Sequence, residues 1–131
     1  MADLKEGAQL PEVKVTPDKY LTARYAGASG DFNPIHIDEQ FALEVGLPGR
    51  ILHGLWSMAQ MARAVGDAAG GDPAALKSLS APFRGMGLME QEMIVSGTVG
   101  EVSGGLATVK LDAVQGSTKV IKGAVAQVRV P

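Results

Sequence analysis

The sequence predicts an α+β fold in which an antiparallel sheet curls around one long helix. Apolar residues occupy nearly every position of the segment 53–65, so a helix there has to be covered on most of its sides. From residue 75 onward, apolar and polar residues alternate with a period of two, which is typical of half-buried strands. At 131 residues the chain is expected to form one domain over 1–131.

The elements before the long helix are expected to be short. Residues 1–15 are expected to hold an opening strand or extended arm. At Thr16-Pro17-Asp18, a capping hydroxyl, a proline and an acid occur in the order that favours a helix start. This helix is predicted to run to about Ala26 and to stop near Gly27. After it we expect a loop over 28–37, a short helical turn over 38–46, and a turn at Pro48-Gly49.

The long helix and the strands follow from their own patterns. Three residues spaced i, i+3 and i+6 are predicted to form the polar stripe of the helix: Ser57, Gln60 and Arg63. Glycines at 66, 70 and 71 are predicted to end it. Strands rich in Val and Thr are predicted at 76–83, 94–102, 106–114 and 119–130, with hairpin turns at Gly104-Gly105 and Gln115-Gly116-Ser117.

The composition argues against several classes of function. The formal net charge of -2 argues against a nucleic-acid surface or a polybasic membrane surface, because phosphate binding needs clustered Lys and Arg. Cysteine is absent, which excludes disulfides, thiol catalysis and thiolate metal sites. The N-terminus does not have the pattern of a signal peptide, and no apolar run reaches about 18 residues. A cytoplasmic protein is therefore expected.

The segment 25–42 reads YAGASGDFNPIHIDEQFA and carries the densest chemical pattern. Asp31 and His36 stand five residues apart, and Asn33-Pro34 restrict the chain between them. We expect Ile35 and Ile37 to be buried, so that alternation turns His36 to the opposite side. A carboxylate and an imidazole held in this way can transfer protons. The competing interpretation is an aspartate in a Gly-Asp turn and an unrelated surface histidine.

His53-Gly54 opens the long helix. The N-terminus of a helix has unpaired N–H groups and a partial positive charge, and glycine lets a ligand approach the backbone closely. The Gly54 N–H is therefore a candidate donor to a carbonyl oxygen that becomes an oxyanion. For His53 itself we expect capping or packing at the helix start.

Three other site chemistries fit the sequence less well. Asp31, His36 and His53 are possible metal ligands, but the loop spacing is not a helical pair and His53 comes from another element, so no metal is predicted. Ser29 with His36 and Asp31 has the residue types of a nucleophile triad, but the Gly-x-Ser-x-Gly elbow is absent. The glycine-rich segment 85–90 lacks a third glycine and precedes a strand, so we interpret it as a turn.

These motifs resemble the MaoC-like, or hydratase 2, family. The family pattern is an aromatic residue, then Ser-Gly-Asp-x-Asn-Pro-(aliphatic)-His, then a small residue; here these are Tyr25, the segment from Ser29 to His36, and Ala42. The segment 50–55, Arg-Ile-Leu-His-Gly-Leu, resembles the family's entry into its central helix. The resemblance extends over essentially the whole chain. It is closest to single-domain (3R)-hydroxyacyl-ACP dehydratase subunits of the mycobacterial type.

The resemblance implies a hot-dog fold, a homodimer or a heterodimer with a related hot-dog subunit, and no dissociable cofactor. It implies reversible hydration of a trans-2-enoyl thioester of CoA or acyl carrier protein to the (R)-3-hydroxyacyl thioester. Asp31 and His36 would hold the water, and the Gly54 N–H would donate a hydrogen bond to the thioester carbonyl. Substrate contacts would come from Asn33, Ser29, His53 and Arg50. Arg50 and Arg84 are candidates for phosphate contacts, and ordinary surface arginines are an equally good interpretation.

Three alternatives stay open. One is a thioesterase on the same fold, and another is a non-catalytic binding or structural subunit of a hetero-oligomer. His36 counts against the thioesterase, because thioesterases of this fold usually rely on a carboxylate without this spacing to a histidine. The intact Asp31–His36 pair counts against the non-catalytic subunit, which has no reason to keep it. The third is a heteromeric dehydratase whose substrate carries a bulky steroid or polyketide side chain, and the sequence does not distinguish it from a fatty acyl enzyme.

Overall fold

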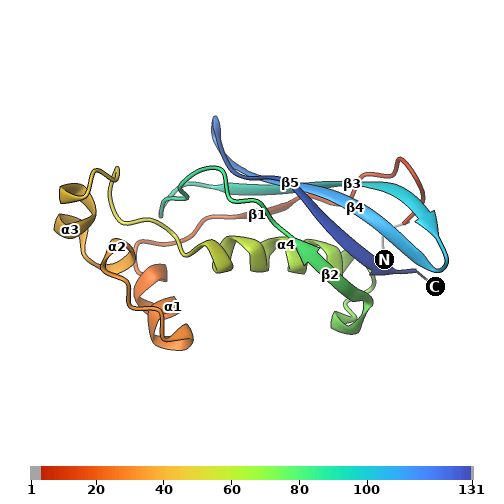
Figure 1. The fold of residues 1–131 in the computed structure, drawn as a ribbon, viewed down its shortest axis with the longest axis horizontal. Helices are drawn as coiled ribbons and strands as arrows, with labels where there is room; N and C mark the ends of the chain where they lie inside the picture. The colour runs from red at the N-terminus through yellow and green to blue at the C-terminus, as the bar shows by residue number, and fades with distance from the viewer. Residues whose placement is uncertain (1–3, 131) are drawn as a thin grey trace.

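A five-stranded antiparallel sheet curls over the helix α4 (Gly54–Ala68), as Figure 1 shows for the computed structural model, which describes residues 4–130. The strand order is β1-β3-β4-β5-β2, and every neighbouring pair is antiparallel. The strands are β1 (Val13–Val15), β2 (Leu76–Ser80), β3 (Met93–Ser103), β4 (Leu106–Gln115) and β5 (Thr118–Arg129). The predicted α+β architecture is confirmed.

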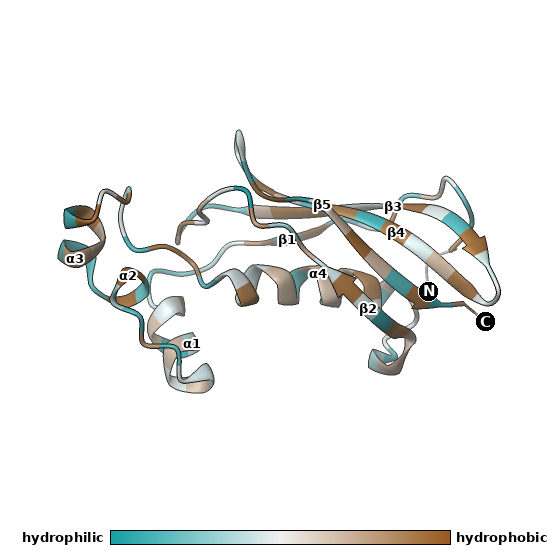
Figure 2. Ribbon diagram, viewed as in Figure 1, coloured by the Kyte–Doolittle hydropathy of each residue, from teal (hydrophilic) through white to brown (hydrophobic). Residues whose placement is uncertain are grey.

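The core lies between α4 and the inner face of the sheet. Along β3, β4 and β5 the hydropathy changes from residue to residue, as the banding in Figure 2 shows. The inward residues pack on the helix, and the largest fully buried side chains are Met61, Met93, Leu111 and Ile121. Full burial of such a side chain contributes about 1.5–3 kcal/mol, so this layer supplies much of the free energy of folding.

The three strands predicted at 94–102, 106–114 and 119–130 are confirmed with shifts of at most one residue at their ends. The strand predicted at 76–83 is shorter, because β2 ends at Ser80 and Phe83 makes only an isolated bridge to Ile121. β1 lies within the expected N-terminal arm. Both predicted hairpins are present, with positive φ at Gly104, Gly105 and Gly116.

The long helix differs from the prediction in two ways. It passes through Gly66 and ends at Ala68, and the first glycine with positive φ beyond it is Gly70. Its predicted polar stripe faces solvent only in part: Ser57 is only 1% exposed, whereas Arg63 at the other end of the stripe is exposed, as is Leu55 at 65%. The sheet covers the helix face on which Ser57 lies, so contact with the sheet, and not residue polarity, decides which side faces solvent.

Three shorter helices cluster where α4 begins: α1 (Leu21–Ser29), α2 (Pro34–Ile37) and α3 (Glu39–Glu44) (Figure 1). α3 confirms the helical turn expected over 38–46. α1 starts later than predicted: the Asp18 carboxylate, ahead of the helix, accepts from the Tyr20 N–H and pairs with Arg24 within it. It also continues past Gly27 and ends before Gly30, whose φ of 81° is favourable only for glycine. In the described part of the chain, no helix is long and apolar enough to cross a membrane.

Candidate active site

The loop predicted over 28–37 contains a helical turn, α2, from Pro34 to Ile37. The Asn33 side chain caps α2 by accepting from the Ile35 N–H at 3.2 Å, and Pro34 takes the first helical position. Successive side chains in a helix point about 100° apart and do not alternate. The predicted burial is therefore inverted: Ile37 is 39% exposed and His36 only 7%.

His36 has a defined orientation. Its Nδ1 lies 2.8 Å from the carbonyl oxygen of Ile51. A carbonyl oxygen only accepts hydrogen bonds, so the Nδ1 proton is donated to it and Nε2 presents a lone pair. Nε2 faces the Asp31 Oδ2 at 3.9 Å. This distance is too long for a direct hydrogen bond, and it suits a bridging water molecule.

Asp31 stands at the surface, with its side chain 53% exposed, while two hydrogen bonds hold its backbone and a third is accepted by its carboxylate. The Asp31 N–H donates to the Ser29 Oγ at 3.1 Å, and the Asn33 N–H donates to the Asp31 Oδ1 at 3.2 Å. The Asp31 carbonyl accepts from His53 Nε2 at 3.0 Å. These contacts leave Oδ2 free to face His36. In this structure Ser29 and Asn33 shape the loop around the carboxylate.

His53 packs between two aromatic rings. Its ring centroid lies 3.9 Å from that of His36 in a stacked arrangement, and 4.5 Å from that of Tyr25. The expectation of packing is confirmed and that of capping is wrong, since the side chain makes no cap hydrogen bond. Because Nε2 donates to Asp31, Nδ1 is the unprotonated nitrogen, and it is buried without a partner. His53 thus ties the start of α4 to the Asp31 loop.

The fold brings together the three candidate metal ligands that the sequence separates. One potential ligand atom from each of Asp31, His36 and His53 lies within 4.8 Å of the others. However, each imidazole already gives one nitrogen to a backbone carbonyl, that of Ile51 or Asp31. Each ring therefore keeps one free nitrogen, and the absence of a metal stays a prediction.

Gly54 is the first residue of α4, and its cap offers no side-chain acceptor to the first turn. A Cβ atom at this position would lie 3.0 Å from Cε1 of Phe83, so the ring rests directly on the glycine. Phe83 is 50% exposed and comes from the segment after β2. The sequence contained no signal for Phe83 or for the Ile51 carbonyl, since both act through contacts between distant segments.

The two arginines considered for phosphate binding differ. The Arg50 Nε pairs with Glu39 Oε2 at 3.1 Å, so its charge is already compensated. Arg84 is exposed and has no ion pair among residues 4–130.

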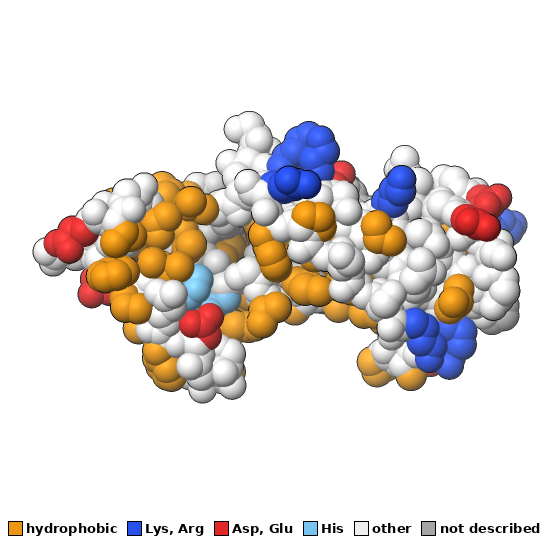
Figure 3. All heavy atoms as spheres, viewed as in Figure 1, with side chains coloured by type: hydrophobic (Ala, Val, Ile, Leu, Met, Phe, Trp, Pro, Cys, Tyr) orange, Lys and Arg blue, Asp and Glu red, His pale blue; other side chains and the backbone are white. Residues whose placement is uncertain are grey.

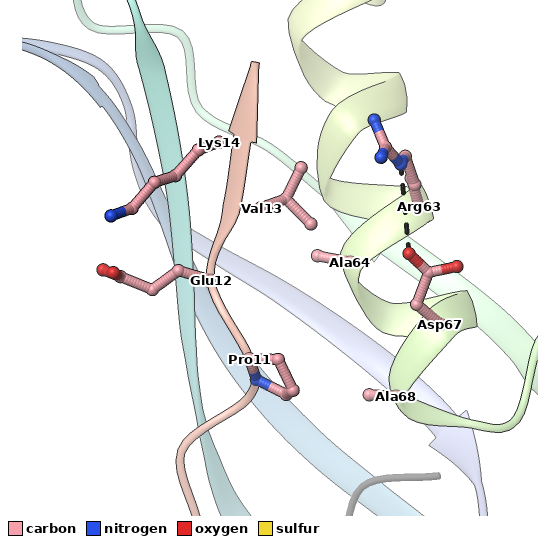
Figure 4. Close-up of a pocket in the computed structure, with 8 residues that line it drawn as sticks. All are labelled: Pro11, Glu12, Val13, Lys14, Arg63, Ala64, Asp67 and Ala68. Carbon is pink, nitrogen blue, oxygen red and sulfur yellow. Dashed lines mark ion pairs between the residues drawn. The ribbon is translucent and has the colours of Figure 1, made fainter.

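Hydrophobic side chains surround the histidines over α2 and α3, as Figure 3 shows. The most exposed large apolar residues in this part of the chain are Phe32, Leu43, Val45 and Leu55, at 54–65%. A separate pocket of about 520 Å³ lies between β1 and the second half of α4, with the Arg63–Asp67 ion pair on its helix side (Figure 4). That pocket does not include Asp31 or His36.

Comparison with known proteins identifies the family. The model of the MaoC like domain matches residues 3–121. The chain belongs to the MaoC-like domain family. It is 43% identical over 75 residues to the fatty acid synthase subunit beta of Aspergillus oryzae, and 38% identical over 73 residues to the peroxisomal enoyl-CoA hydratase 2 of Arabidopsis thaliana. These matches cover 56% and 55% of the chain, but only 4% and 23% of the two relatives.

Among solved structures, the fold of this MaoC-like chain is similar to one in the ChsH1-ChsH2 complex from Mycobacterium tuberculosis. The TM-score is 0.86 at 26% identity, over 96% of this chain and 98% of the other. The predicted hot-dog fold is confirmed by this similarity and by the sheet curled over α4.

Proposed function

We propose that this MaoC-like protein adds water reversibly to trans-2-enoyl thioesters and forms (R)-3-hydroxyacyl thioesters. The observation that carries the proposal is the 3.9 Å separation of Asp31 Oδ2 and His36 Nε2, beside the N-terminus of α4. Both atoms accept hydrogen bonds, so a water molecule between them can donate to each. The name of the Arabidopsis relative, enoyl-CoA hydratase 2, supports this reaction class.

In the proposed hydration, Asp31 removes a proton from the water while its oxygen bonds to C3 of the enoyl group. The proton taken from the water is passed on to C2, with His36 managing this transfer, so one water is consumed, both side chains return to their starting protonation, and no other reactant is needed. As C3 is attacked, the thioester oxygen gains negative charge, and the Gly54 N–H donates to it. Acid–base catalysis of this kind contributes about 10²–10⁴-fold, and one oxyanion donor about 3–4 kcal/mol.

The direct test follows the ultraviolet absorbance of the conjugated enoyl thioester. Purified protein is added to crotonyl-CoA and to a longer trans-2-enoyl-CoA, with release of free thiol measured in parallel. Loss of absorbance without thiol release supports the hydratase. Thiol release would instead support the thioesterase, and a folded protein inactive on both would contradict a self-sufficient hydratase of linear acyl-CoA.

We also propose that the active form is a dimer, of two copies or with a related hot-dog subunit. β2 is an edge strand with an unpaired side, and large apolar side chains around it and α4 are exposed, including Leu55, Phe83 and Met86. Exposed edges and apolar surface of this kind favour pairing with another chain. The ChsH1-ChsH2 complex, to which this chain is similar, supports a second subunit.

Gly54→Ala is expected to lower turnover by about tenfold to a hundredfold, while the protein stays folded. The added methyl group would meet the Phe83 ring at 3.0 Å, and this half-exposed ring can swing away. The space at the N-terminus of α4, where the thioester carbonyl is proposed to bind, then changes shape. Steady-state kinetics on crotonyl-CoA measure the effect. Gly66→Ala, where a Cβ meets nothing within 4 Å, is the matched control and is expected to keep full activity.

His53→Phe is expected to keep the ring packing but to release the Asp31 carbonyl. Stability should change by no more than about 1 kcal/mol, because the variant removes one hydrogen bond together with one unpaired buried nitrogen. kcat should nevertheless fall, since the Asp31 loop loses its anchor. Thermal unfolding and kinetics are measured together. A variant with unchanged kcat would show that His53 does not position Asp31.

A further inference from the structure

β5 is bulged in two places, on either side of Ile121. Ala113 pairs with Ile121 and the next residue, Val114, with Lys119, so Val120 is an extra residue in β5. On the other side, Lys122 and Gly123 together oppose the single residue Asp112. Gly123 has a φ of 71° and donates its N–H to Asp112 Oδ1 at 2.8 Å. Such bulges redirect side chains.

The redirected side chains are Lys119 and Lys122. In a regular strand, residues three apart point to opposite faces, but here both lysines are exposed and approach each other. The nearby Lys119 ammonium lowers the pKa of the Lys122 ammonium, because like charges repel each other. Arg84 adds to this lowering, and the Asp112 carboxylate opposes it. Two ammonium groups held together are stabilised by an anion that binds between them.

Arg84 reaches the same place from the segment after β2. The Arg84 backbone N–H donates to the carbonyl of Val120 at 2.9 Å, and Val120 follows Lys119 in the chain. The backbones are close, since a Cβ at Gly85 would lie 2.6 Å from the Lys119 carbonyl oxygen. None of the three cations has an ion pair with a described residue. Lys and Arg side chains gather near the β4–β5 hairpin in Figure 3.

This basic cluster, defined as Arg84, Lys119 and Lys122, is connected to the candidate active site through the chain that leads into Arg84. Phe83, whose ring rests on Gly54, directly precedes Arg84 in the chain. Arg50, the other arginine considered for phosphate binding, is paired with Glu39, whereas Arg84, Lys119 and Lys122 make no ion pair with a described residue.

We infer that Arg84, Lys119 and Lys122 bind the phosphate end of the pantetheine arm that carries the acyl thioester. This inference rests on the proposed function, because it concerns the phosphate group of the proposed thioester substrate. Ammonium and guanidinium groups are the natural partners of phosphate oxygens. CoA and acyl carrier protein share a phosphate at the end of pantetheine, so the same cluster suits both.

The test is calorimetric binding of free CoA, 4′-phosphopantetheine and pantetheine to the intact protein. The double variant Lys119→Gln/Lys122→Gln is expected to bind CoA about tenfold more weakly and to bind pantetheine as the wild type does. Lys14→Gln/Lys19→Gln changes the same number of exposed charges, on β1 and just before α1, and is the matched control. It is expected to bind CoA normally.

The outcomes separate the sources of phosphate and the two proposals. Loss of affinity for 4′-phosphopantetheine as well as CoA assigns the cluster to the shared phosphate, and loss for CoA alone assigns it to the nucleotide phosphates. Unchanged CoA binding in the cluster variant, an equal loss in the control, or no CoA binding by the wild type would overturn the inference. Because binding needs no turnover, failure of the enoyl-thioester assay is a separate result that bears on the proposed function.

Discussion

Asp31→Asn is expected to reduce turnover of crotonyl-CoA by about 10²–10⁴-fold without loss of the fold. The amide has the shape of the carboxylate, so its oxygen can still accept from the Asn33 N–H, and the backbone contacts to Ser29 and His53 are unchanged. What is lost is the base that takes the proton of the water. Stability should be nearly unaffected, since the side chain is 53% exposed and the 3.9 Å approach to His36 is not a direct hydrogen bond.

The measurement is the initial rate of absorbance loss, together with thermal unfolding of the same sample. Asp67→Asn is the matched control, because Asp67 is similarly exposed and pairs with a cation, Arg63, also at 3.9 Å. It should keep the wild-type rate. A folded Asp31→Asn protein with near-normal turnover would reject Asp31 as the base.

His36→Asn is expected to lower turnover to a similar extent and, unlike Asp31→Asn, to destabilise the protein by about 1–3 kcal/mol. The shorter amide can still donate to the Ile51 carbonyl in place of Nδ1, but it has no atom at the position of Nε2. It also removes the ring that stacks on His53 and leaves space in a buried site. Kinetics and denaturant unfolding separate the two effects.

The double variant sharpens this test. If Asp31 and His36 hold one water molecule between them, the protein lacking both should be scarcely slower than the slower single variant, because either loss alone removes the shared function. If the fold reduction in the double variant equals the product of the two single reductions, the two residues act independently, which would contradict the proposed mechanism.

Local signals in the sequence were sufficient for the main elements. Alternation predicted the three long strands to within one residue, and the apolar run at 53–65 predicted the central helix, because both patterns report burial on one face. The spacing of Asp31 and His36 and the glycine after His53 also pointed to the candidate site. The family likeness added the reaction to be expected.

Predictions failed where local preference competed with packing. Pro34 was treated as a helix breaker, but with Asn33 as a cap it starts α2, and this turned His36 inward. The polarity of Ser57 predicts a place in the polar stripe of α4, but the sheet covers this residue. Gly27 and Gly66 did not end their helices, since neither is in the left-handed conformation there.

The sequence by itself determined the fold class, the central helix, the long strands and the residue types of the candidate site, since each depends on spacing along the chain. Only the tertiary structure decided the tautomer of His36, the tie from His53 to Asp31, the contact of Phe83 with Gly54 and the meeting of Lys119, Lys122 and Arg84. The physical reason is that a hydrogen bond or an electrostatic contact depends on distance in space. Chain segments far apart in sequence come within that distance only once the sheet has closed over α4.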